Sequence, residues 1–149
     1  MLDAVDLLAG QGLFANDKVL IQSGNNPDFQ ALHCQQQSFL SADQFVETIK
    51  DASIVISHAG AGTLIHSLRA GKTPVVIPRR KEYGEHVDNH QCELLEALVD
   101  EGRVVPAYDV QDLPAAIEQV RKRTTKPIPA QPCQMIKLVA KAICELGRR

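Results

Sequence analysis

Short apolar runs alternate with amphipathic segments along most of the chain. In six segments the apolar residues recur at helical spacing, and signals such as the Ser41-x-x-Gln44 capping box, Gly71 and Gly102 mark where helices start or stop. The predicted helices cover residues 2–9, 41–52, 62–70, 87–101, 112–122 and 133–147. The apolar runs between them predict strands at 18–22, 31–35, 54–57, 74–77 and 104–107.

This alternation of strands and helices predicts an α/β fold with a parallel, Rossmann-like sheet between two layers of helices. The 149 residues suit a single domain. Residues 124–132 hold three prolines and are predicted to be an extended connector to the last helix. A sheet of this kind normally opens with a strand and a glycine turn, whereas this chain opens on a predicted helix. We expect either that a first strand has been lost or that the sheet is completed in another way.

Composition narrows the class of protein. A hydrophobic content of 44%, a charged content of 23% and a net charge of −2 are typical of a globular domain and give no reason to expect a nucleic-acid partner. No apolar run approaches the roughly 18 residues that cross a bilayer, and residues 1–12 lack the basic flank of a signal peptide. The cysteines form no CxxC pair and no HExxH is present, so we expect a cytoplasmic protein with reduced thiols, no metal and no cofactor. The cysteines are Cys34, Cys92, Cys133 and Cys144.

A glycine-rich turn follows the predicted strand at 54–57. Glycine lets the backbone approach a ligand closely and adopt positive φ, and the N–H groups at the start of the next helix favour an anion such as a phosphate or diphosphate. Neither GxxxxGK[ST] nor the full GxGxxG is present, because Ile65 stands where the third glycine would be. A tight turn without a ligand is the alternative. The candidate binding residues are Ser57, His58, Ala59, Gly60, Ala61, Gly62 and Thr63.

A polar loop, residues 78–91, leaves the end of the neighbouring predicted strand and should face the same crevice. Amide side chains at the start of the following helix suit sugar hydroxyls, and arginines suit a phosphate or an acidic partner. A solvated loop capped by Asp88 is the alternative reading, and Glu85 with His86 could form a general acid/base pair. The candidate residues are Pro78, Arg79, Glu85, His86, Asn89, His90 and Gln91.

The segments SHAGAGT and AGKTPVVIPRRKEYGEHVDNHQCELLEAL closely resemble the glycosyltransferase family 28 C-terminal domain. Within that family the chain is most similar to the short stand-alone donor-binding subunits of two-component enzymes. These subunits act in asparagine-linked glycosylation and in bacterial exopolysaccharide synthesis. The resemblance covers nearly the whole chain, including KVLIQSGN and FLSADQFVETIKDASIVISHAG.

The resemblance implies the C-terminal half of a GT-B glycosyltransferase, which binds a UDP-sugar and transfers a hexose-type sugar with inversion and without metal. Ser57 to Thr63 would contact the diphosphate, Pro78 and Arg79 would lie beside the uridine, and Asn89 and Gln91 would reach the sugar. A separate membrane-anchored subunit would hold the lipid-linked acceptor and supply the catalytic base, so no catalytic residue is assigned here. The chain would then be peripheral at the membrane through that partner.

The sequence departs from the family pattern at two points. His66 stands where related enzymes often carry a ribose-binding glutamate, and the usual opening strand with its Gly-Thr turn is absent. Two other functions stay open: a stand-alone nucleotide-sugar epimerase or hydrolase of the GT-B type, and a non-enzymatic interaction module. Self-association into a homo-oligomer also stays open.

Overall fold

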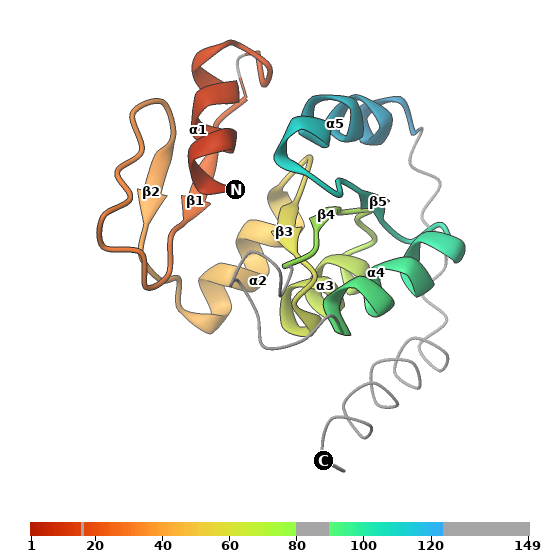
Figure 1. Cartoon of the computed structure of the whole chain (residues 1–149). Coiled ribbons are helices and arrows are strands. Elements are labelled where there is room, and N and C mark those ends of the chain that lie inside the picture. Colours follow the sequence, from red (N-terminus) through yellow and green to blue (C-terminus); the bar gives the residue numbers. More distant parts are fainter. Residues whose placement is uncertain (16, 80–89, 124–149) are drawn as a thin grey trace. The chain divides into compact units, whose positions relative to one another are not determined.

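The computed structural model describes residues 1–15, 17–79 and 90–123, with residues 90–93 described by their backbone (Figure 1). By contacts the chain divides into two compact units, Met1–Asp51 and Ala52–Arg149, and each is considered by itself. The prediction of one domain over 1–149 therefore stays a prediction. Across the described ranges no helix has the length and apolar character needed to cross a membrane.

The first unit contains two helices and a pair of parallel strands. Strand β1 (Leu20–Gln22) pairs with β2 (Gln35–Gln37), with Leu20 opposite Gln35. Helix α1 (Leu2–Gly10) precedes the strands and α2 (Ala42–Asp51) follows them. The predicted capping box of α2 is confirmed, since the Gln44 N–H donates to Ser41 Oγ at 3.3 Å and the Ser41 N–H donates to Gln44 Oε1 at 3.0 Å.

The carboxylate of Asp6 ties α1 to the segment that precedes β2. Asp6 is 6% exposed, and it accepts N–H bonds from Leu32 at 3.0 Å, His33 at 2.9 Å and Cys34 at 3.0 Å. Because these N–H groups bind a carboxylate, they are not available to a strand ladder. The strand predicted at 31–35 was therefore misplaced, and β2 begins only at Gln35.

These contacts also set the charge of the first unit. Burial raises the pKa of the Asp6 carboxyl, but the N–H bonds from His33 and Leu32 outweigh burial and leave it below its ordinary value of 3.8. Partial burial, with a hydrogen bond and the negative charge of Asp6, raises the pKa of the Cys34 thiol to about 11. Cys34 is a free thiol, as predicted; the other three cysteines fall outside the described side chains.

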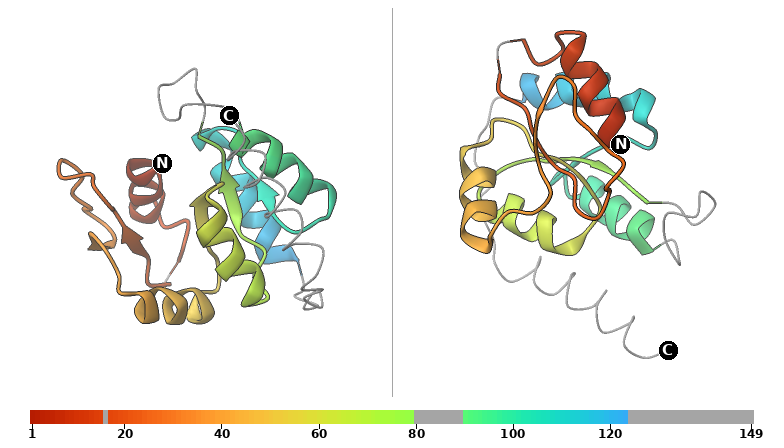
Figure 2. Two further views of the ribbon diagram at one scale, coloured as in Figure 1. Left: turned by 90° about the horizontal axis from the view of Figure 1, so that it is seen from below. Right: turned by 90° about the vertical axis from the view of Figure 1, so that its left-hand side faces the viewer.

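The second unit is a three-layer α/β arrangement. Its parallel sheet has the order β3 (Ile56–His58), β4 (Val75–Ile77) and β5 (Val105–Pro106). Helices α3 (Ala61–Arg69) and α4 (His90–Asp100) cover one face, and α5 (Leu113–Lys122), which follows the short 3-10 helix η2 (Val110–Asp112), covers the other (Figures 1 and 2). The predicted Rossmann-like α/β class with parallel strands is confirmed.

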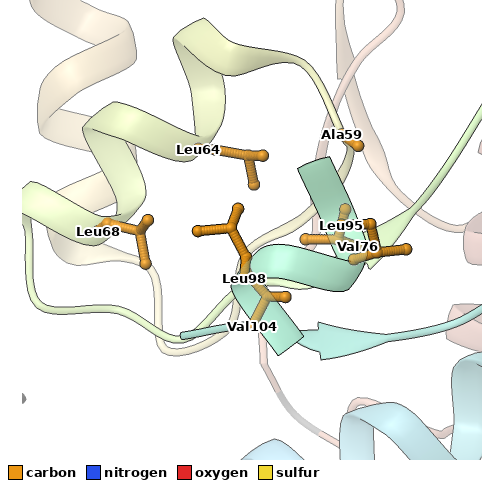
Figure 3. Packing of buried hydrophobic residues seen from close by; sticks show 7 residues of the cluster. All are labelled: Ala59, Leu64, Leu68, Val76, Leu95, Leu98 and Val104. Atoms are coloured by element: carbon orange, nitrogen blue, oxygen red, sulfur yellow. The ribbon is translucent and has the colours of Figure 1, made fainter. Parts of the chain in front are cut away.

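The main core of this unit lies between the sheet and the helix pair α3 and α4 (Figure 3). Leu64 and Leu68 of α3 meet Leu95 and Leu98 of α4 over Val76 of the central strand. Alternation along β4 turns Val75 and Ile77 to the opposite face, towards α5, so every residue of β4 is buried. A central strand buried on both faces explains why this run of the sequence is uniformly apolar.

Several predicted boundaries shift by a few residues. The strand predicted at 54–57 is Ile56–His58, so His58 belongs to the strand rather than to the turn. The strand predicted at 104–107 is confirmed at Val105–Pro106. Helix α4 is described from His90, and the predicted start at 87 lies outside the described residues, as do the connector 124–132 and the helix at 133–147.

Candidate functional site

The carboxyl ends of β3 and β4 lie side by side. The register places Ser57 opposite Val76 and His58 opposite Ile77. His58 Nδ1 lies 3.1 Å from the Ile77 carbonyl oxygen and links the two strand ends directly. The chain therefore leaves β3 towards α3, and leaves β4 towards the polar loop, at the same edge of the sheet. In open α/β sheets this edge is where ligands bind.

The glycine turn is shorter than predicted. Gly60 is the N-cap of α3 with φ −80° and ψ 124°, and Ala61, Gly62 and Thr63 form the first turn of the helix. Neither Gly60 nor Gly62 has positive φ, so the turn does not use the left-handed conformation that glycine allows. The chain needs no left-handed residue here because an extended N-cap leads directly from strand to helix.

What glycine provides at these two positions is access. Apart from its own neighbours along the chain, a Cβ placed on either Gly60 or Gly62 would meet no atom of the described residues within 4 Å. Gly62 is exposed and Gly60 is half-buried. The fold thus has room for side chains at both positions, and their absence leaves the backbone open to an incoming group.

The start of α3 presents a set of backbone donors. The first helical bond runs from the Leu64 N–H to the Gly60 carbonyl at 3.1 Å. In the described part of the chain, the N–H groups of Ala61, Gly62 and Thr63 have no hydrogen-bond partner, and no side chain caps the helix. Such groups carry partial positive charge and bind anions well.

Packing holds these donors in place. Ala59 and Leu64, each 2% exposed, flank the donors in sequence and belong to the core cluster of Figure 3. Within α3, the Ser67 hydroxyl donates to the Thr63 carbonyl at 2.8 Å. Ser57 Oγ donates to the His58 carbonyl at 2.9 Å, at the end of β3. The donors therefore sit on a rigid part of the fold.

The structure describes the second cluster of predicted residues only in part. Pro78 is buried and Arg79 is exposed directly after β4. His90 and Gln91 lie in the first turn of α4, with their side chains outside the described set. Glu85, His86 and Asn89 lie outside the described residues, so the acid/base pair of Glu85 and His86 stays a prediction.

One contact at this site could not be seen in the sequence. The shifted pKa values of Asp6 and Cys34 belong to the first unit and not to this site. Sequence reasoning missed the bond from His58 to Ile77, because a strand histidine gives no sign of which carbonyl it will contact. A search of the described side chains finds no group of three or more His, Cys, Asp or Glu that could hold a metal ion.

Comparison with known proteins adds the family. The model of the glycosyltransferase family 28 C-terminal domain matches residues 1–146. The UDP-N-acetylglucosamine transferase subunit ALG13 of Yarrowia lipolytica is 31% identical over 104 residues, which cover 67% of this chain and 51% of that protein. The proteins of the same name from Mus musculus and Homo sapiens are each 42% identical over 62 residues, covering 42% of this chain and 5% of each of those proteins.

The chain therefore spans about half the length of the Yarrowia relative and a small part of the two mammalian ones. The family model, by contrast, covers nearly all of this chain. The resemblance read from SHAGAGT and EHVDNHQ is thus confirmed, and the chain belongs to the glycosyltransferase family 28 C-terminal domain family.

Proposed function

We propose that the chain is the UDP-sugar-binding subunit of an inverting two-component glycosyltransferase. One structural observation carries the proposal. At the start of α3, near the ends of β3 and β4, three N–H groups have no partner among the described residues. Two of the residues there are glycines, and no described side chain fills the space beside them. A diphosphate matches this arrangement in charge and in its need for several donors. The family, and the transferase name of the relatives, support a nucleotide sugar as the source of that diphosphate.

In the proposed complex the diphosphate lies at residues 57–63. Fixed N–H donors and the positive end of α3 then offset the negative charge that builds up on the departing UDP, which lowers the barrier to transfer without a metal ion. Pro78 and Arg79 lie beside the uridine. Asn89 and Gln91 bind the sugar hydroxyls, and Glu85, His86 and His90 complete the polar loop around them.

The acceptor half comes from another protein in this proposal. A membrane-anchored subunit holds a lipid-linked acceptor and supplies the catalytic base, so the chain works in the cytoplasm at the membrane surface. The sugar is a hexose type, and N-acetylglucosamine is the first to test because the relatives' name carries it. The products would serve glycolipid or polysaccharide synthesis.

Titration calorimetry of the full chain with UDP, and with UMP as the matched control, tests the proposal. We expect UDP to bind more tightly than UMP because the second phosphate adds acceptors for the α3 donors. Absence of UDP binding would contradict the proposal and favour an interaction module. Turnover of a UDP-sugar without a partner or acceptor would instead indicate a stand-alone epimerase or hydrolase.

A further inference from the structure

Basic side chains gather at the edge of the second unit where its parallel strands begin. The register places Val75 of β4 opposite Val105 of β5, and the Val105 N–H donates to the Pro74 carbonyl at 3.0 Å. Lys72 and Arg103 come just before these two strands, so both lie at this edge of the sheet. The candidate donor site is at the opposite edge, where the strands end.

Helices α3 and α5 bring further basic residues to the same edge. Arg69 is the last residue of α3, and Arg121 and Lys122 end α5. The Arg123 guanidinium donates to the Gly102 carbonyl at 3.2 Å, which joins the end of α5 to the turn before β5. Together these side chains form what we call the basic edge: Arg69, Lys72, Arg103, Arg121, Lys122 and Arg123.

Acidic residues offset only part of the charge of the basic edge. Glu101 lies 3.6 Å from Arg103, and Glu118 lies 3.2 Å and 4.0 Å from the two basic residues that end α5. Asp100, in the last turn of α4, is the third acidic residue described there. Six basic side chains thus face three acidic ones, which leaves a local excess of positive charge on a chain whose net charge is −2. The basic residues that form no ion pair within the described ranges are Arg69, Lys72 and Arg123.

The chain continues from the basic edge into the most basic part of its sequence. Residues 121–149 hold 8 of the 16 lysines and arginines but only 1 of the 18 aspartates and glutamates. In residues 133–147, which lie outside the described ranges, the sequence predicts a helix that mixes basic and apolar residues. The large apolar residues there are Met135, Ile136, Leu138, Val139, Ile143 and Leu146.

We infer that the basic edge binds a membrane surface that carries anionic lipid headgroups. Each lysine or arginine near such a surface is attracted to it, and the attraction adds up over several residues. Apolar residues interspersed with basic ones favour lipid over nucleic acid, because the headgroup region of a bilayer accommodates both kinds of side chain. A nucleic-acid backbone would attract the charges alone.

This inference goes beyond the proposed function, in which a partner subunit holds the chain at the membrane. The basic edge supplies a direct contact with lipid that needs no partner. Because it lies at the opposite edge of the sheet from the start of α3, lipid and a diphosphate can be bound at the same time. Neither contact depends on the other.

Flotation of the full chain with lipid vesicles tests the inference. One set of vesicles is phosphatidylcholine alone, and the other contains about 30% phosphatidylserine. We expect binding to the anionic vesicles only. Their Kd should rise about tenfold or more between about 0.1 M and about 0.5 M salt, because salt screens exposed charges. Equal binding to both kinds of vesicle, or binding to neither, would overturn the inference.

A double variant locates the contact. Arg69→Gln combined with Lys122→Gln removes two exposed charges from the basic edge, and the Kd for anionic vesicles should rise about tenfold or more with little change in Tm. Gln35→Glu combined with Gln37→Glu is the matched control, because it lowers the net charge equally on exposed residues of β2. The control should bind vesicles as the wild type does. Should the double variant lose Tm, Lys122→Gln alone makes the same test, since its side chain is 80% exposed.

The remaining outcomes separate this inference from its alternatives. Equal losses in the two double variants would show that net charge alone decides binding and would overturn a role of the basic edge. Retention by duplex DNA without vesicle binding would overturn it in favour of a nucleic-acid partner. Vesicle binding by a chain that fails to bind UDP would leave this inference standing and overturn the proposed function, and the converse result would do the reverse.

Discussion

The two units of this protein each gather three backbone N–H groups, and they use them in opposite ways. In the first unit the donors of Leu32, His33 and Cys34 converge on the carboxylate of Asp6, which the chain itself provides. In the second, the donors at residues 61–63 open α3, and no described residue accepts from them. Filled donors hold a fold together, whereas unfilled donors on a rigid support are available to a ligand.

The largest expected effect comes from removing the Asp6 carboxylate, which accepts from the three N–H groups of the first unit. Asp6→Ala leaves three N–H groups without their acceptor and frees the segment before β2 from α1, so we expect Tm to fall by at least several degrees. Thermal unfolding followed by circular dichroism measures the change. Asp3→Ala removes an exposed carboxylate from the same helix and should alter Tm little. Equal effects of the two variants would contradict a structural role for Asp6.

Burial of Cys34 and its contact with Asp6 should also lower the reactivity of its thiol. A pKa near 11, against an ordinary 9.0, leaves the thiol with about a hundredfold less thiolate at neutral pH. We expect alkylation of Cys34 by iodoacetamide to be slower by about that factor in the folded protein than in denaturant. Mass spectrometry of the peptide that contains Cys34 separates it from the other cysteines. Equal rates would contradict a raised pKa of the Cys34 thiol in the folded protein.

A carboxylate introduced at the start of α3 should occupy the N–H groups of residues 61–63, as Asp6 does for those of the first unit. In Gly60→Asp the new carboxylate has room, and an N-cap aspartate accepts N–H bonds from the first turn of its helix. We expect stability to rise by about a few tenths of a kcal/mol. We also expect UDP affinity to fall by about tenfold or more through like-charge repulsion.

Gly60→Asn is the matched control for that variant, because it caps the helix without a charge. Calorimetry with UDP should show a smaller loss of affinity for Gly60→Asn than for Gly60→Asp. Wild-type affinity in Gly60→Asp would place the diphosphate away from the start of α3.

The smallest expected effect is the loss of stability that Asp6 causes at low pH. The pKa of Asp6 is lower in the folded state than its ordinary 3.8, so the folded state binds fewer protons in acid. The resulting stabilisation is present above pH 3.8 and is lost as pH falls through the folded pKa. Carboxyl chemical shifts followed by NMR give the Asp6 pKa directly. A value at or above 3.8 would contradict the proposed hydrogen-bond effect.

Much of the fold follows from local patterns in the sequence. Apolar periodicity predicted the order of strands and helices. The capping box of Ser41 and Gln44 forms as predicted, because its partners are three residues apart. The family could also be recognised from the sequence, since its motif residues occur in a fixed order. The candidate residues of the glycine turn could be named because phosphate binding needs particular residue types directly after a strand.

Contacts between distant residues were decided only by the tertiary structure. Asp6 displaces the predicted second strand through bonds to residues 26 to 28 positions away, and His58 meets a carbonyl 19 positions away. The open space beside Gly60 and Gly62 depends on which side chains do not reach them. Periodicity reports which residues are apolar and how they repeat, but hydrogen-bond partners and empty space depend on how segments pack. The sequence alone therefore predicted the type of site, and the packing decided which donors stay open and which carbonyl His58 contacts.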